Sequence, residues 1–288
     1  MPFRICYLNG QYLPLEEARI SPLDRGFLFG DAVYEVMPVY GGRPFRFEAH
    51  CERMTLSLAE IRMADPLSRA EWRTVIGTLI SRNGGGDQYV YWQVSRGAEA
   101  GRNAAPLPDV PRTIFAFCAP FPVPAPDALE EGVSCITAND TRWMRCDIKA
   151  TTLLANVLLR QQAVDAGAAE AILLRNGELT EGSSSAVHVV IDGQLRTPPH
   201  SEKLLPSTTR AVVEEMAERA GIPHCSAPVT EAQLRVAEEI WLSSAVREVL
   251  PVTRLDGRPV GSGRPGPLWQ RVYAEFQRYK RELADQPW

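Results

Sequence analysis

Lysine is scarce in this sequence of 288 residues. Only three of the 31 basic residues are lysines, Lys149, Lys203 and Lys280, and the other 28 are arginines. Arginine stays protonated under ordinary conditions, whereas a lysine amine that is removed from water can lose its proton and act as a nucleophile. Lys149 ends the segment RWMRCDIK and directly precedes an apolar run. It is therefore a candidate for chemistry rather than for simple surface charge.

The sequence lacks the residue patterns that several classes of function require. The four histidines lie far apart, and the six cysteines form neither a CxxC pair nor a Cys/His cluster with zinc spacing, so no metal site is expected. The net charge is −4 and the arginines are scattered among 35 acidic residues, which argues against a nucleic-acid partner. No apolar stretch approaches the length of a membrane span, and no secretory segment is visible. These features predict a cytoplasmic protein with reduced thiols.

The order of the expected elements predicts an α+β protein in two parts. The Asn9-Gly10 and Asn176-Gly177 pairs stand between apolar segments and predict β-hairpins. The segment SPLDRGFLFGD is expected to be a glycine-punctuated loop, and helical periodicity follows in FEAHCERMTLSLAEIRM and near residues 153–166. Four prolines lie within 119–127, which is expected to be a linker between a domain at 1–118 and a second at 128–288.

Three features of the second half fit one another. Lys149 is a potential nucleophile, and Glu181 in LTEGSSSAV (179–187) is a carboxylate at an expected strand end. The segment PSTTR (206–210) opens an expected helix, whose first N–H groups and positive dipole end are a natural phosphate seat. Pyridoxal 5′-phosphate (PLP) requires such a lysine, carboxylate and phosphate seat. Taken singly, each feature also has a simpler interpretation: a solvated surface charge, a turn, or an N-cap.

Four segments resemble, in order and at similar spacing, those of the class IV aminotransferases. These PLP-dependent enzymes have fold type IV, and within them the chain is most similar to the D-amino acid aminotransferases. The resemblance covers nearly the whole chain and is carried by DRGFLFGDAVYEV (24–36), HCERM (50–54), RWMRCDIK (142–149) and LTEGSSSAV.

The resemblance implies a role for each matching residue. Lys149 would form the Schiff base with PLP and shuttle the proton between the substrate and the cofactor, and Glu181 would pair with the pyridinium nitrogen. Arg53 matches the phosphate-binding arginine, with a helix-surface cation as the alternative. Tyr34 matches the tyrosine on the substrate side, with a half-buried strand aromatic as the alternative. The remaining cofactor-binding candidates are Ser184, Thr208, Thr209 and Ser244.

The sequence departs from the family pattern where the substrate carboxylate should bind. The family's Arg-x-His pair corresponds to Arg102 and Ala104 in a loop that is one residue longer, so alanine stands where the family has histidine. Arg247 stands where the family has a small polar residue, and an arginine can grip a carboxylate bidentately. We therefore expect Arg102, Arg247 or Arg25 to bind the substrate carboxylate, with an ion-paired structural arginine as the alternative for Arg247.

The expected reaction is a ping-pong transamination in a homodimer. A D-amino acid or an (R)-primary amine would convert PLP to pyridoxamine phosphate, and a 2-oxo acid such as 2-oxoglutarate or pyruvate would accept the amino group. The alternatives are an aminodeoxychorismate lyase, a branched-chain aminotransferase, and a binding protein that keeps the fold without turnover.

Overall fold

The computed structural model describes residues 5–122, 127–284 and 288 and divides the chain into two compact units. The first unit contains Met1–Phe121 together with Ile148–Leu153 and the C-terminal residue. The second unit contains the rest of the chain from Pro122 onward. The predicted linker at 119–127 includes residues 123–126, which lie outside the described residues, so the proposed domain boundaries stay a prediction.

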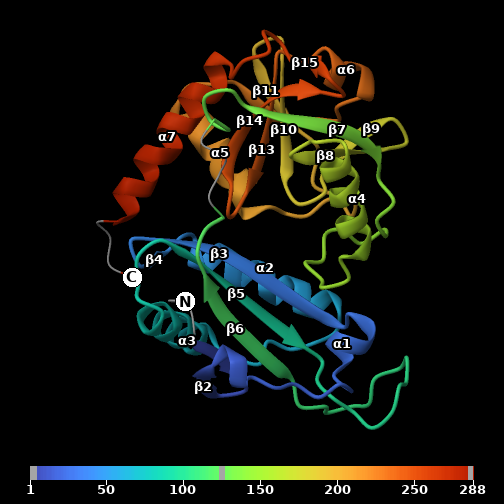
Figure 1. Cartoon of the computed structure of the whole chain (residues 1–288), viewed down its shortest axis with the longest axis vertical. Coiled ribbons are helices and arrows are strands. Elements are labelled where there is room, and N and C mark those ends of the chain that lie inside the picture. Colours follow the sequence, from blue (N-terminus) through green and yellow to red (C-terminus); the bar gives the residue numbers. More distant parts are fainter. Residues whose placement is uncertain (1–4, 123–126, 285–287) are drawn as a thin grey trace. The chain divides into compact units, whose positions relative to one another are not determined.

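The first unit is built on a six-stranded sheet with two helices packed on one face (Figure 1). Its strand order is β2-β1-β6-β5-β3-β4. Side chains alternate between the two faces of each strand, so that Val33, Met37 and Val39 of β3 lie in the core with Trp72 and Trp92. The elements are β1 Ile5–Leu8, β2 Gln11–Pro14, η1 Leu15–Glu17, α1 Arg25–Phe29, β3 Ala32–Tyr40, β4 Arg43–Pro44, α2 Phe47–Glu60, α3 Arg69–Arg82, β5 Gln88–Ser95 and β6 Thr113–Ala119.

The second unit contains a nine-stranded sheet, of which eight strands follow the order β12-β11-β10-β13-β14-β7-β8-β9, and β15 pairs with β14. Helix α4 packs on β7 and β8, and α5 packs on β13. The elements are β7 Val133–Asn139, α4 Leu154–Asp165, β8 Glu170–Arg175, β9 Glu178–Gly182, β10 Ala186–Ile191, β11 Gln194–Thr197, α5 Thr208–Arg219, β12 His224–Ser226, α6 Glu231–Arg235, β13 Glu239–Ser244, β14 Glu248–Leu255, β15 Arg258–Pro259 and α7 Pro267–Ala284.

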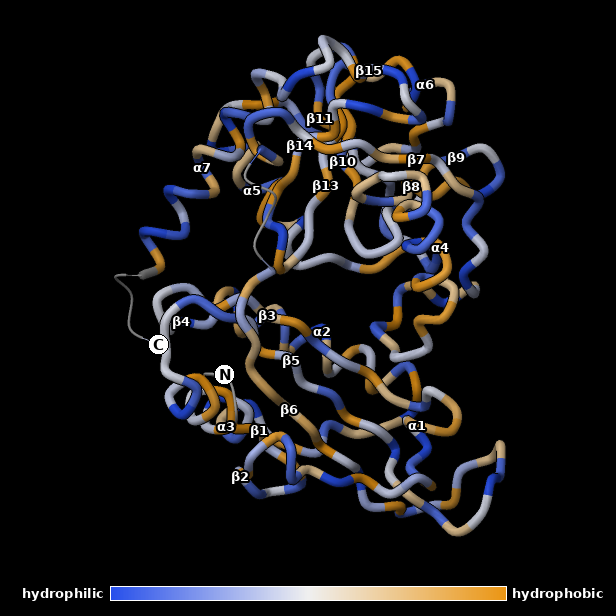
Figure 2. Tube along the Cα trace, in the orientation of Figure 1, coloured by the Kyte–Doolittle hydropathy of each residue, from blue (hydrophilic) through white to orange (hydrophobic). Residues whose placement is uncertain are grey.

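The last helix shows how an amphipathic pattern becomes packing. Figure 2 shows hydrophilic and hydrophobic residues alternating along α7. Trp269, Val272, Phe276 and Tyr279 recur at three- and four-residue steps and are buried, and α7 packs against α5. No helix in the described part of the chain is both long enough and apolar enough to cross a membrane.

The structure confirms both hairpins but corrects the glycine-punctuated loop. Asn9 and Asn176 have positive φ values of 47° and 55°, as their hairpin turns require. Within SPLDRGFLFGD, however, residues 25–29 form α1. Asp24 caps this helix by accepting a hydrogen bond from the Gly26 N–H, and Gly30 ends it in the left-handed conformation. The glycine spacing pointed to a loop because the cap and its tertiary partners are not visible in the sequence.

Candidate active site

Lys149 belongs to the short segment Ile148–Leu153, which packs alongside β3 of the first unit. The Lys149 carbonyl accepts a hydrogen bond from the Tyr34 N–H at 2.9 Å, and its own N–H donates to Ser57 Oγ at 3.2 Å. The same segment also lies close to the end of α1, because a Cβ on Gly30 would be 2.5 Å from Thr152 Cγ2. Only glycine at position 30 permits both the positive φ and this approach.

The Lys149 amine is half-buried and lies over an aromatic ring rather than beside a carboxylate. Its Nζ is 4.3 Å from the centroid of the Tyr34 ring. Within the described ranges, no acidic group lies within ion-pair distance of this Nζ. Lys280, by contrast, pairs with Glu248. The Lys149 Nζ therefore contacts the ring face of Tyr34 and forms no ion pair with the acidic residues that the structure describes.

Behind Tyr34, the neighbouring strand position Glu35 points to the opposite face and holds two residues of α2. The Glu35 carboxylate is fully buried and accepts hydrogen bonds from Arg53 Nε at 2.7 Å and Arg53 Nη2 at 2.8 Å. It also lies 2.8 Å from His50 Nδ1. Burial alone would raise the pKa of Glu35, but the charge of Arg53 and the hydrogen bonds from Arg53 and His50 lower that pKa to about 2.

The position of Arg53 excludes one of its two sequence interpretations, and its phosphate-binding role stays a prediction. Its side chain is only 8% exposed and is held bidentately, so the helix-surface alternative is wrong. Glu35 and His50 received no role from the sequence, although both lie inside the quoted motifs DRGFLFGDAVYEV and HCERM. Sequence shows the charges, but only the fold shows that β3 and α2 bring them together.

In the second unit, Glu181 ends a chain of alternating charges. The Glu181 carboxylate is buried; one oxygen accepts a hydrogen bond from Arg142 Nη1 and the other from the Leu205 N–H at 3.1 Å. Arg142 in turn donates twice to Asp140, each bond at 2.9 Å, and Arg175 pairs with the same Asp140. Burial raises the pKa of Glu181, and the nearby Arg142 charge opposes that rise. A carboxyl with a raised pKa is suited to sharing a proton with a basic nitrogen.

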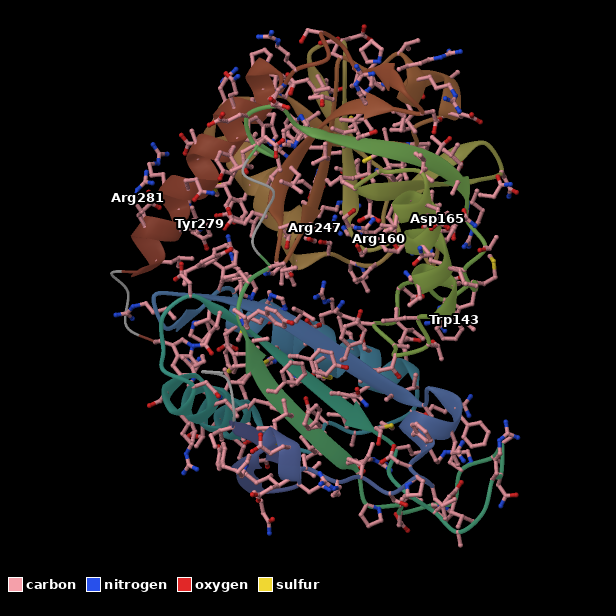
Figure 3. All side chains as sticks on the ribbon, viewed as in Figure 1. Trp143, Arg160, Asp165, Arg247, Tyr279 and Arg281 are labelled. Carbon is pink, nitrogen blue, oxygen red and sulfur yellow. The ribbon has the colours of Figure 1, made fainter. Side chains whose placement is uncertain are left out.

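The serine turn that follows Glu181 is organised by a second buried carboxylate, Glu170, which no sequence pattern had indicated. The hydroxyls of Ser183, Ser184 and Ser185 all donate to Glu170, that of Ser184 at 2.8 Å. Arg247, labelled in Figure 3, donates through Nη2 to Glu170 at 2.7 Å and to Ser184 Oγ at 2.5 Å. Its Nε and Nη1 have no partner among the residues that the structure describes.

The segment that is predicted to bind phosphate lies at the start of α5. Ser207 caps this helix by accepting the Arg210 N–H at 3.2 Å, and Thr208 and Thr209 occupy the first turn, where N–H groups lack intrahelical acceptors. Helix α5 packs on β13, whose last residue is Ser244. The Ser244 Oγ is buried and lacks a hydrogen-bond partner in the described part of the chain. A buried hydroxyl without a partner is costly and indicates a missing polar ligand.

The three arginines considered for the substrate carboxylate differ in what they already bind. All three nitrogens of Arg25 donate inside the first unit, to Asp31, Glu99 and the carbonyls of Asn103 and Ala104. Arg102 is exposed, with its guanidinium carbon 4.8 Å from the centroid of the Phe29 ring. Arg102 and Arg247 therefore remain the candidates with donors to spare.

The predicted residues thus fall into two groups. Those in the first unit are Tyr34, Arg53, Arg102 and Lys149, and those in the second are Glu181, Ser184, Thr208, Thr209, Ser244 and Arg247. Residues 32–255 match the family model of amino-transferase class IV, and the chain belongs to that family. The predictions of an aminotransferase and of a fold-type IV, α+β architecture are confirmed.

Several proteins of similar sequence are D-alanine aminotransferases. The chain is 38% identical over 273 residues to a D-alanine aminotransferase of Staphylococcus aureus (strain MSSA476), a match that covers 95% of this chain and 96% of that protein. It is also 38% identical over 270 residues to a D-alanine aminotransferase of Bacillus licheniformis, covering 93% and 94%.

Several of the similar solved structures are branched-chain amino acid aminotransferases. A T.th. branched-chain amino acid aminotransferase, solved with pyridoxamine 5′-phosphate, is 28% identical with a TM-score of 0.89, and the match covers 98% of this chain and 96% of that one. The same enzyme has been solved with N-(5′-phosphopyridoxyl)-L-glutamate. The Escherichia coli branched-chain enzyme has a TM-score of 0.91 over 99% and 97%, but at 24% identity it shows the fold alone.

Proposed function

We propose that this chain is a PLP-dependent transaminase that moves an amino group from a D-amino acid to a 2-oxo acid such as 2-oxoglutarate or pyruvate. The observation that carries the donor class is the 38% identity to D-alanine aminotransferases over 95% of the chain. The local support is Lys149, a half-buried amine held over Tyr34 with no acidic partner among the described residues.

The residues present fit PLP. The buried Ser244 hydroxyl without a partner and the first turn of α5 suit a phosphate, and Arg53 offers a guanidinium oriented by Glu35. Glu181, whose pKa is raised by burial, suits the ring nitrogen. When bound, the cofactor would supply an electron sink that acidifies the α-hydrogen of the donor. Each of these groups is thus proposed for one part of the cofactor, which is the phosphate, the ring nitrogen or the aldehyde carbon.

The side chains around the proposed cofactor would each carry out one task in the reaction. Lys149 Nζ would hold the cofactor covalently and, after the donor amine takes its place, move the proton to and from the donor α-carbon. Tyr34 would keep that amine in position through its ring face. Arg142 would orient Glu181 by donating to one of its oxygens, which leaves the remaining lone pairs of the carboxylate for the ring nitrogen.

We also propose that the enzyme is a cytoplasmic homodimer. Helix α4 supports an assembly, because Leu154, Val157 and Leu158 are each more than half exposed on one stretch of the helix. Light scattering that gives a mass of 31.9 kDa, that of one chain, would contradict the dimer.

A donor panel tests the proposed function. D-alanine, L-leucine and (R)-1-phenylethylamine are supplied in turn with 2-oxoglutarate, and the cofactor absorbance and the new amino acid are followed. We expect D-alanine to react fastest. Faster reaction of L-leucine would support the second candidate, a branched-chain aminotransferase, which the similar solved structures favour. Release of pyruvate from aminodeoxychorismate without any 2-oxo acid would support the lyase.

The arginine that binds the substrate carboxylate can be found by comparing Arg102→Ala with Arg247→Ala. Loss of a charge-assisted carboxylate contact should raise KM for D-alanine roughly tenfold or more. It should not raise KM for (R)-1-phenylethylamine, which has no carboxylate and serves as the matched control substrate. If neither variant changes KM for D-alanine, neither Arg102 nor Arg247 binds the substrate carboxylate. If Arg247→Ala raises KM for both donors alike, its bond to Glu170 is structural.

A further inference from the structure

The face of the first sheet opposite α2 and α3 carries a row of aromatic rings that begins at Lys149. The Tyr34 and Tyr91 rings are stacked with centroids 5.5 Å apart and an interplanar angle of 24°. Tyr91 contacts Phe117 at 5.1 Å, and Phe117 contacts Phe115 at 5.6 Å. We call Tyr34, Tyr91, Phe117 and Phe115 the aromatic row. It crosses the neighbouring strands β3, β5 and β6 (Figure 1).

Strand register places these rings side by side on one face. Tyr91 lies opposite Phe117, and Gln93 lies between Tyr34 on β3 and Phe115 on β6. Their strand neighbours point the other way into the core, as the complete burial of Trp92 and Ala116 shows. The four rings of the row are only half-buried. The row is therefore a surface of this unit and not part of its core.

One polar contact fixes the middle of the row. The Tyr91 hydroxyl donates to Gln93 Oε1 at 2.7 Å, which orients the ring without placing a charge on this face. Burial raises the pKa of Tyr91, so the hydroxyl stays neutral and remains a donor. The row thus offers oriented, uncharged ring faces, which stack well with another aromatic ring.

The position of Lys149 determines which part of a bound amino donor can reach the aromatic row. Its Nζ is 4.3 Å from the Tyr34 centroid, at one end of the row. In the proposed function the donor's nitrogen takes the place of this Nζ, so the donor α-carbon comes within bonding distance of that point. A methyl side chain would end near Tyr34. The far carbon of a benzyl side chain lies about 5 Å from the α-carbon, a reach comparable with the spacing of the rings.

We propose that the aromatic row is a subsite for an aryl side chain of the amino donor, so that D-phenylalanine and other D-amino acids with an aryl side chain are preferred over D-alanine. The inference rests on the proposed function, because it is the reaction at Lys149 that brings the donor to the row. It adds the kind of donor side chain to the donor class that the proposed function names.

Phe117→Leu tests the subsite, because it keeps apolar volume at position 117 but removes the ring. We expect the ratio of kcat/KM for D-phenylalanine to kcat/KM for D-alanine to fall about tenfold. Phe117→Ala should lower the ratio at least as far. Phe27→Leu, a change of the same kind at a ring that is 69% exposed on α1, should leave the ratio unchanged.

A binding measurement keeps the test independent of turnover. Calorimetry with 3-phenylpropionate and with propionate should show that Phe117→Leu weakens the aryl ligand about tenfold relative to the short one. An unchanged binding ratio would overturn the subsite, even in an enzyme that transaminates D-alanine well. If Phe117→Leu makes a dimer dissociate but changes neither the kcat/KM ratio nor the binding ratio, the subsite is also overturned. The aromatic row would then be a surface that a second copy of the chain covers. If neither D-amino acid reacts but the binding ratio falls, the proposed function fails and the aryl subsite stands.

Discussion

Replacing Lys149 by alanine is expected to lower kcat for D-alanine by about 10⁴-fold, because the proposed proton transfer at the donor α-carbon loses its base. Of the other two lysines, Lys280 is paired with Glu248 and Lys203 lies in the second unit. Single-turnover absorbance of the bound cofactor measures the loss directly. In the unaltered enzyme, borohydride treatment followed by peptide mass mapping should place the cofactor on residue 149.

Lys203→Ala is the matched control, since its side chain makes no ion pair among the described residues. This variant should keep its activity within about twofold of the unaltered enzyme, as expected for a surface substitution. Cofactor attached by borohydride to residue 203 or 280 would contradict the role of Lys149. So would a Lys149→Ala variant that keeps a tenth or more of its activity.

The parts of the fold that sequence could predict depend on short-range physics. The Asn9-Gly10 hairpin needs only two residues that tolerate positive φ, and α7 needs only its three- and four-residue apolar repeat. Helix α1 was missed because its cap depends on distant partners. The Asp24 carboxylate that accepts the Gly26 N–H also accepts the hydroxyls of Ser95 and Thr113, which lie 71 and 89 positions away.

The candidate site shows the same division. Lys149, Glu181 and Arg53 stand in recognisable segments, so sequence could point to them. Their supporting partners could not be found in this way, because each lies in another element. Arg142 reaches Glu181 across 39 positions, and Arg247 reaches Glu170 across 77. A carboxylate in a sequence carries no mark of its burial, and burial is what makes Glu170 a centre that three serine hydroxyls and an arginine share.

Removing one such buried charge should have a large effect on both stability and cofactor binding. Glu35→Gln keeps the shape of the side chain but leaves the buried Arg53 without its bidentate acceptor. We expect the free energy of unfolding of the cofactor-free protein at pH 7 to fall by about 3 kcal/mol. The Kd for PLP should rise about tenfold or more, since the guanidinium proposed to hold the phosphate loses its orientation. Urea unfolding and cofactor titration measure the two effects.

The dependence on pH separates this carboxylate from an ordinary structural residue. The pKa of Glu35 is about 2 in the folded chain against a usual value of 4.5, so the unfolded chain takes up the proton first as the pH falls. The stabilisation is therefore complete above pH 4.5 and decreases as the pH falls from there toward 2. The difference in unfolding free energy between the unaltered protein and Glu35→Gln should stay constant from about pH 7 to about pH 4.5 and narrow from there toward about pH 2. Glu52→Gln, an exposed position next to Arg53, should show neither the loss nor this pH dependence. A difference that stays constant with pH, or an unchanged Kd for PLP, would mean that Glu35 does not act through Arg53.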